Sequence, residues 1–106
     1  MFCIVYSFKV LPGRDEDLID SWTDLTKLIY QYEGSLGSRL HRTPDESYIA
    51  YAQWPSRERW KESGDNLPEE ATHASKRMRE ACSEISTVYE LDPIQDLIQS
   101  TTFKEE

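Results

Sequence analysis

The chain contains two histidines, His41 and His73, and imidazole is the side chain best suited to proton transfer near neutral pH. His73 lies in a segment with helical spacing, but well away from the apolar stripe of that segment. An exposed surface position is therefore the alternative to a role as general base or axial ligand. His41 shares one face of a predicted strand with Arg39, and the pair could hold an anionic or phenolic substrate through charge-assisted hydrogen bonds. The alternative is an edge strand whose charges prevent sheet-to-sheet association.

Aromatic side chains form the second group that could carry function. Tyr and Trp bury large rings and keep a polar tip that needs a hydrogen-bond partner. Such residues can line a pocket for a planar aromatic ligand, although core packing is their more common role. With Arg39, the residues predicted to contact a substrate are Tyr6, Tyr51, Trp54 and Trp60, drawn from a wider aromatic set that also includes Trp22 and Tyr48.

Motifs that hold cofactors and metals are absent from the sequence. It has no glycine-rich phosphate loop, no paired Cys or His-x-x-x-His spacing and no nucleophile elbow. Cys3 and Cys82 lack metal-ligand spacing, and two cysteines do not resemble the disulfide framework of a small secreted domain. The sequence therefore predicts reduced cysteines, no bound cofactor and no metal.

The charge balance argues against two classes of partner. With 20 acidic and 12 basic residues the net charge is -8, which repels nucleic acid and anionic membrane surfaces. The apolar opening at residues 1–8 lacks a basic region and a cleavage site, and no later apolar run could span a bilayer. We therefore expect an unprocessed cytoplasmic protein that binds neither nucleic acid nor membrane.

The N-terminal half predicts a strand, a long helix and a hairpin. Apolar residues alternate over 2–10, which predicts a strand. Apolar spacings of three and four, with acidic residues in the first turn, predict a helix over about 14–33 that Gly34 ends. The segments 36–43 and 47–54 flank a turn with Pro and Asp, and together predict a β-hairpin.

The C-terminal half predicts two helices and a last strand. Ser56 is the predicted N-cap of a short helix. Asn66 is the predicted N-cap of a second helix, whose apolar spacing runs to Ile85. Residues 87–91 predict the last strand, and Asp92–Pro93 can open one more helical turn.

This order of strand, helix, strand, strand, helix and strand predicts a single α+β domain over 1–106, with a core over 2–92 and a C-terminal extension over 93–106. The arrangement is the ferredoxin-like βαββαβ fold, a four-stranded antiparallel sheet whose first and third strands are central. Helices cover only one face of such a sheet. The other face is partly apolar here, so a partner sheet is expected to cover it, and the sequence predicts a homodimer.

Three segments of the chain resemble the antibiotic biosynthesis monooxygenase superfamily, whose members are dimeric α+β barrels. They are Val10–Gly13 before the first helix, Glu33–Arg39 before the second strand and Tyr51–Glu58 at the end of the third. They follow the order and spacing of the family over about residues 2 to 92. The resemblance therefore implies the dimeric α+β barrel.

The resemblance also implies an activity, cofactor-independent oxygenation of a small aromatic molecule. In that chemistry the pocket deprotonates a phenol or hydroquinone, and the resulting carbanion reacts with oxygen directly. The protein would supply a base, for which His73 and His41 are the catalytic candidates, and an aromatic pocket. Substrate contacts are predicted for Tyr6, Arg39, Tyr51, Trp54 and Trp60.

Two alternatives remain open. A non-catalytic module that binds a small molecule or another protein could use the same fold, because function resides in the site and not in the fold. The haem-degrading branch of the superfamily is the lesser alternative. That branch has an Asn where Tyr6 stands and a pocket Trp one turn after Trp60, where this chain has Ser63. Its histidine could correspond to His73.

Overall fold

The structure is a computed structural model that describes residues 1–103 of the 106-residue chain. It confirms the predicted order of elements, including the short helix between the third strand and the last helix. No helix within the described residues is both long enough and apolar enough to cross a membrane. The elements are β1 (Phe2–Val10), α1 (Asp15–Glu33), β2 (Ser38–Arg42), β3 (Tyr48–Trp54), α2 (Arg57–Lys61), α3 (Glu70–Glu80) and β4 (Cys82–Leu91).

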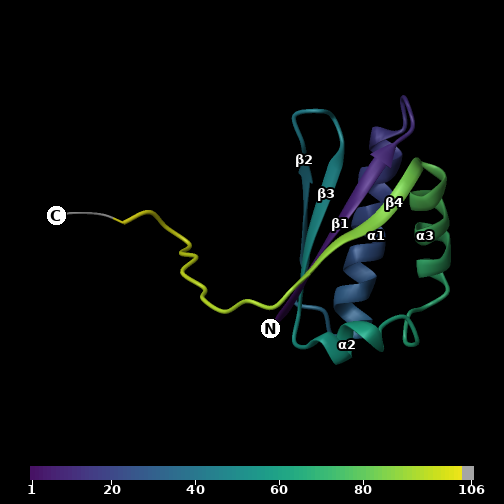
Figure 1. Ribbon diagram of the computed structural model, residues 1–106. Coiled ribbons are helices and arrows are strands. Elements are labelled where there is room, and N and C mark those ends of the chain that lie inside the picture. The colour runs from purple at the N-terminus through teal and green to yellow at the C-terminus, as the bar shows by residue number, and fades with distance from the viewer. Residues whose placement is uncertain (104–106) are drawn as a thin grey trace.

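The four strands form one antiparallel sheet in the order β2-β3-β1-β4, so the first and third strands are central, as predicted. β1 and β3 pair from Phe2 opposite Trp54 to Phe8 opposite Tyr48. In Figure 1, α1 and α3 lie against one face of this sheet, and α2 lies near one end of it. The α+β ferredoxin-like fold is therefore confirmed.

The core lies between this sheet and the helices. The even-numbered residues of β1 and β3 point toward the helices, because side chains alternate along a strand. They meet the apolar face of α1 and the small residues of α3. The buried residues of this layer are Phe2, Ile4, Phe8, Leu18, Tyr48, Ala50, Ala52, Trp54, Ala71, Ala74 and Ala81.

The opposite face of the sheet, which we call the open face, carries the odd-numbered residues of β1 and β3 and their neighbours on β2 and β4. Val5 lies opposite Tyr51 on one side and Tyr89 on the other, and Arg39 lies opposite Tyr51. No helix within residues 1–103 covers this face (Figure 1). Tyr89 is 61% exposed.

Two predicted boundaries in the second half of the chain are wrong. Asn66 does not cap a helix. Its side chain donates a hydrogen bond to Glu33, and α3 begins at Glu70. The helix also does not continue to Ile85, because β4 already begins at Cys82 and pairs with β1. A local apolar spacing cannot reveal this long-range pairing, which decides the outcome.

The predicted helical turn after Asp92 is also wrong. Residues 92–103 contain neither helix nor strand and extend away from the sheet, as Figure 1 shows. Ile94 is 95% exposed, so the apolar residues of this segment find no core in the described structure, and a single turn is not stable without one. The last three residues of the predicted extension lie outside the described part of the chain.

Candidate functional site

A cavity of about 230 Å³, partly open to solvent, lies between the sheet and the two long helices. We call it the inner cavity. Its walls are mostly apolar, with a few hydroxyl groups among them, which is typical of a site for a small organic ligand. The lining residues are Tyr6, Phe8, Trp22, Leu25, Thr26, Ile29, Ser35, Ser38, Trp54, Met78 and Ile85.

Tyr6 is the polar group of this cavity with the most defined environment. It points from β1 toward the helices, and its hydroxyl oxygen accepts a hydrogen bond of 2.9 Å from Trp60 Nε1. Burial raises the pKa of the Tyr6 phenol, the hydrogen bond from Trp60 opposes that rise, and the charge of Glu90 adds to it. Tyr6 therefore stays neutral at pH 7 and keeps its proton.

That proton is available to a ligand. Since the indole N–H can only donate, the Tyr6 oxygen uses one lone pair for Trp60, and its own O–H needs a separate acceptor. Within the described residues the Tyr6 hydroxyl donates to no protein atom. A ligand oxygen in the inner cavity would supply the missing acceptor.

Of the other hydroxyl groups, those of Ser38 and Ser35 are engaged at least in part, whereas Thr26 Oγ1 makes no hydrogen bond within the described residues. Ser38 Oγ donates to the carbonyl oxygen of Tyr51 at 3.0 Å, and Ser35 Oγ accepts from the backbone N–H of Gly37 at 2.9 Å. Among the lining residues of this cavity there is no His, Asp, Glu, Lys or Arg. The inner cavity can therefore bind and orient a neutral or phenolic molecule, but Tyr6 is its only titratable side chain.

The structure divides the predicted substrate contacts between the two faces of the sheet. Tyr6 and Trp54 line the inner cavity, and Trp60 contacts it through Tyr6. Arg39 and Tyr51 lie on the open face instead, where the Arg39 guanidinium carbon is 5.8 Å from the centre of the Tyr51 ring. One pocket therefore does not contain all of the predicted residues.

The open face holds a polar group of its own. The Tyr51 hydroxyl lies 3.1 Å from Cys3 Sγ and accepts from Gln53, and its pKa is raised chiefly by the contact with Cys3. Arg39 Nε donates to His41 Nε2 at 2.9 Å. A surface groove between α1 and β2 includes His41 among its lining residues and shares Trp22 and Ser38 with the inner cavity.

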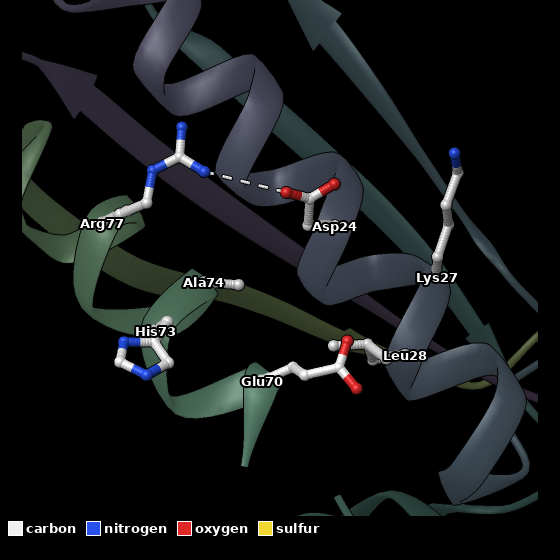
Figure 2. A pocket seen from close by; sticks show the side chains of 7 residues that line it. All are labelled: Asp24, Lys27, Leu28, Glu70, His73, Ala74 and Arg77. Carbon is white, nitrogen blue, oxygen red and sulfur yellow. Dashed lines mark ion pairs between the residues drawn. The ribbon is translucent and has the colours of Figure 1, made fainter. Parts of the chain in front are cut away.

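His73 lies in a third place, on the outer side of the helix layer. It belongs to a surface groove between α1 and α3, where an ion pair of 3.7 Å joins Asp24 and Arg77. In Figure 2, Ala74 and Glu70 point toward α1, whereas the His73 ring is turned away from it. The side chain is exposed, and it is not a lining residue of the inner cavity. Its catalytic role stays a prediction.

Sequence reasoning did not single out several lining residues. Ser35 and Ser38 come from the segment between α1 and β3, and they reach the cavity only once β2 has paired with β3 in the sheet. Thr26 offered a local signal, since it lies next to Leu25 and one turn from Trp22 and Ile29 on the inner side of α1. A polar residue next to the apolar face of a helix indicates a position that contacts water or a ligand, because a buried hydroxyl group needs a hydrogen-bond partner.

The comparisons with known proteins agree with this fold. The Rv0793 protein of Mycobacterium tuberculosis matches with a TM-score of 0.72 and 12% identity, over 92% of this chain and 98% of that one. SnoaB, a cofactor-independent oxygenase from Streptomyces nogalater, matches with a TM-score of 0.71 and 15% identity, over 92% and 97%. Identities this low establish the fold alone. A comparison with curated proteins gives no match.

The comparison with family models adds evidence at the sequence level. The model of the antibiotic biosynthesis monooxygenase family matches residues 1–76, which is well over half of the chain. The match includes β1, α1, the hairpin and α2, and therefore most of the walls of the inner cavity. The chain belongs to the antibiotic biosynthesis monooxygenase family.

Proposed function

We propose that this chain is a cofactor-independent monooxygenase that oxidises a small phenol- or quinol-type molecule in the inner cavity. The observation that carries the proposal is the half-buried Tyr6 side chain, whose hydroxyl is held by Trp60 and has its own proton free for a ligand oxygen. Membership of the antibiotic biosynthesis monooxygenase family supports the reaction class. The similarity to SnoaB, itself a cofactor-independent oxygenase, is in keeping with it.

The size of the cavity limits the substrate. An engineered apolar cavity of about 150 Å³ binds benzene. The inner cavity, at about 230 Å³, therefore suits one aromatic ring or two fused rings. Its apolar walls favour a flat hydrocarbon skeleton, and the free O–H of Tyr6, whose oxygen is held by Trp60, favours a hydroxyl or carbonyl oxygen on the ring.

Tyr6 stabilises the charge that develops on the substrate. A phenol that loses its proton places negative charge on its oxygen and on ring carbons, and a neutral hydroxyl donor in a largely apolar site stabilises that oxygen. Molecular oxygen then reacts at the carbanionic ring carbon. One oxygen atom becomes a new carbonyl and the other leaves as water with two substrate hydrogens, so a phenol becomes a quinone and supplies all four electrons.

The base for this step is a separate part of the proposal. Two shared lining residues, Trp22 and Ser38, connect the groove of His41 to the inner cavity, whereas His73 lies across the helix layer. This arrangement favours His41 over His73. Because the His41 side chain lies with Arg39 on the open face, it could take the substrate proton only at the edge of β2, where its groove meets the inner cavity.

The proposal extends to the location and the oligomeric state of the protein, which we infer to be a cytoplasmic homodimer. The uncovered open face, with Val5, Tyr51 and Tyr89 on it, supports a second copy as its cover, because an apolar sheet face of this kind packs well against another sheet. Cys3 and Cys82 are free thiols, which is typical of a reducing compartment.

A second candidate function is a non-catalytic module that binds the same class of molecule. The observation that favours it is the inner cavity's lack of a lining carboxylate, imidazole or amine within the described residues. In that case the aromatic ligand binds, and no oxygen is consumed.

Oxygen uptake with ligand binding measured in parallel tests the proposal and separates the two functions. Purified protein without added cofactor is mixed with hydroquinone, 1-naphthol or 1,4-dihydroxynaphthalene, and heat-denatured protein gives the background. We expect uptake with quinone formation, and a drop of about tenfold or more in kcat for Tyr6→Phe, since one oxyanion donor is lost. The matched control is Tyr30→Phe, the same change at an exposed site on α1. A ligand-dependent rise in melting temperature without oxygen uptake would establish the binding module. The absence of both the melting shift and the oxygen uptake would refute both functions.

A further inference from the structure

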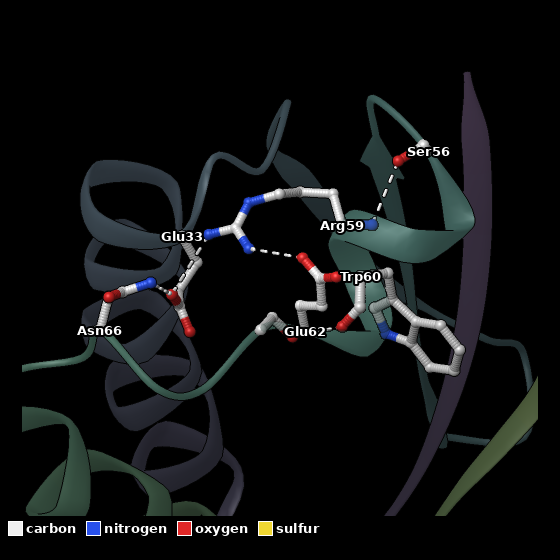
Figure 3. A network of polar contacts seen from close by, with 7 residues as sticks. Glu33, Ser56, Arg59, Trp60, Glu62 and Asn66 are labelled. Carbon is white, nitrogen blue, oxygen red and sulfur yellow. Dashed lines mark hydrogen bonds and ion pairs between the residues drawn. The ribbon is translucent and has the colours of Figure 1, made fainter.

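Glu33, the last residue of α1, is a carboxylate in an unusual place. It is 0% exposed. Its Oε1 accepts a hydrogen bond of 3.0 Å from Asn66 Nδ2 and lies 3.5 Å from Arg59 Nη2, while Oε2 has no hydrogen-bond partner within the described residues. Figure 3 shows Arg59 reaching from α2 to this carboxylate, with Asn66 on its other side. We call Glu33, Arg59 and Asn66 the Glu33 network.

Stability alone does not account for a glutamate at this position. The C-terminal end of a helix favours a cation, and a buried carboxylate with one unpaired oxygen loses hydration that its partners restore only in part. Removal of the Arg59 partner would leave that charge isolated. A role in holding two elements in one geometry would account for the network, and buried ionic groups have this role in some proteins.

The element that this network constrains is α2. It has only five residues, none of them fully buried, and a helix this short has no stability of its own. Its first turn is capped by Ser56, which accepts from the backbone N–H of Arg59. Side-chain contacts to the rest of the molecule therefore set its orientation. Arg59 ties it to α1 through Glu33, and Arg57 ties it to β4 through Glu90.

The residue between these two anchors and the inner cavity is Trp60. It follows Arg59 directly on α2, its indole N–H donates to the Tyr6 hydroxyl at 2.9 Å, and its ring lies 5.4 Å from that of Phe2. The angle of α2 thus decides where the indole N–H meets the Tyr6 oxygen. That in turn decides in which direction the Tyr6 proton points.

We propose that the Glu33 network is a positioning device that holds α2 so that Trp60 directs the Tyr6 O–H into the inner cavity, and that it thereby determines the preference of the cavity for hydroxylated ligands. Glu33 and Arg59 are positioning residues in this proposal, since they act through Trp60. The inference rests on the proposed function in one respect only, that aromatic molecules bind in the inner cavity.

The test compares two ligands of nearly the same shape. 2-Naphthol and naphthalene offer the same two rings, and only the first has an oxygen for Tyr6. The ratio of their dissociation constants, measured by calorimetry on the whole chain, reports the hydroxyl contact. A general loosening of the fold weakens both ligands together and leaves the ratio unchanged.

The main variant is Glu33→Gln, which keeps the volume and the acceptor for Asn66 but removes the charge that holds Arg59. Its matched control is Glu80→Gln, the same change at the last residue of α3, where the carboxylate pairs with Lys76 at the surface. Arg59→Lys is the second variant, because it keeps the charge and loses only the reach and shape of the guanidinium.

We expect Tyr6→Phe to lower the preference for 2-naphthol about fivefold to tenfold, the usual range for one neutral hydrogen bond. Glu33→Gln and Arg59→Lys should lower it about threefold, because the contact is misdirected and not removed. Glu80→Gln should leave it unchanged. An unaltered ratio in Glu33→Gln and Arg59→Lys, beside a reduced one in Tyr6→Phe, would overturn the positioning role and leave the proposed function standing.

A double variant tests whether the network acts through Trp60. Trp60→Phe removes the indole N–H, so the further change Glu33→Gln should then have no additional effect on the ratio. Additive effects would refute the coupling. If wild-type protein binds neither ligand, the proposed function itself fails, and this outcome is distinct from an unaltered ratio.

Discussion

The environment of Tyr6 is the residue-scale basis of the proposed chemistry. The alternation of β1 alone predicts that its side chain faces the helices, and the structure agrees. The alternation could not reveal the partner of its hydroxyl, because Trp60 is 54 positions away in the sequence and reaches Tyr6 only through the fold. A phenol held by one donor and surrounded by apolar walls is a hydrogen-bond donor at neutral pH, and not a base.

The raised pKa of Tyr6 predicts a pH-dependent contribution to stability. Above pH 10.0, the ordinary pKa of a tyrosine side chain, the unfolded chain ionises this phenol while the folded chain still holds its proton. The contribution is therefore fully present below pH 10.0 and is lost as the pH rises through the folded pKa. Urea unfolding from about pH 9 to about pH 11.5 should show a steeper loss of unfolding free energy in wild type than in Tyr6→Phe.

The comparison with Tyr6→Phe isolates this residue. Tyr48 and Tyr51 also have raised pKa values, the first chiefly through its hydrogen bond to Asp15 and the second through Cys3. Both residues remain in the variant, so their contributions cancel in the difference. Parallel curves for the two proteins would show that burial does not hold the Tyr6 proton.

At the scale of elements, the sequence predicts best where several local signals agree. For α1 the acidic first turn, the apolar spacing and Gly34 all indicate the same helix, and the structure places it at Asp15–Glu33. Asn66 carried only a local capping signal, with Glu69 three places on, and a tertiary hydrogen bond to Glu33 outweighed that signal. The start of β4 depends on pairing with β1, which no local pattern contains.

Gly34 joins the local and the tertiary level, and this predicts the effect of its substitution. It ends α1 with φ 76°, a conformation that side chains adopt at a cost of about 1–2 kcal/mol. A Cβ there would also lie 3.2 Å from Arg59 Nε, inside the Glu33 network. Gly34→Ala should therefore lower the unfolding free energy by more than the backbone strain alone.

Gly13 provides the matched control for that variant. It has the same φ of 76°, and an added Cβ would meet nothing within 4 Å. Gly13→Ala should therefore show the backbone strain by itself, and urea unfolding of both variants measures the difference. Equal losses in the two variants would mean that Arg59 moves aside freely and that the contact at Gly34 has no energetic weight.

At the scale of the whole molecule, the two faces of the sheet have different structural roles. One face builds the core and the inner cavity with α1 and α3. The open face carries apolar and aromatic side chains together with Arg39 and His41, and no helix in the described residues lies on it. The predicted site residues divided between these faces because strand alternation identifies which residues share a face, but not which face encloses a cavity.

This division predicts that the open face forms the contact of a homodimer. Two such sheets pack about 10 Å apart, so a side chain at the centre of the contact loses its water. Tyr89→Glu should then place an unpaired charge in the interface and separate the copies, while the exposed position keeps each chain folded.

Tyr30→Glu is the control, since Tyr30 is 62% exposed against 61% for Tyr89 but lies on α1, away from this face. Sedimentation velocity at micromolar concentration should give about twice the 12.4 kDa chain mass for wild type and Tyr30→Glu, and the single mass for Tyr89→Glu. A wild-type protein that sediments as one chain, or a Tyr89→Glu protein that stays paired, would show that this face is not the contact.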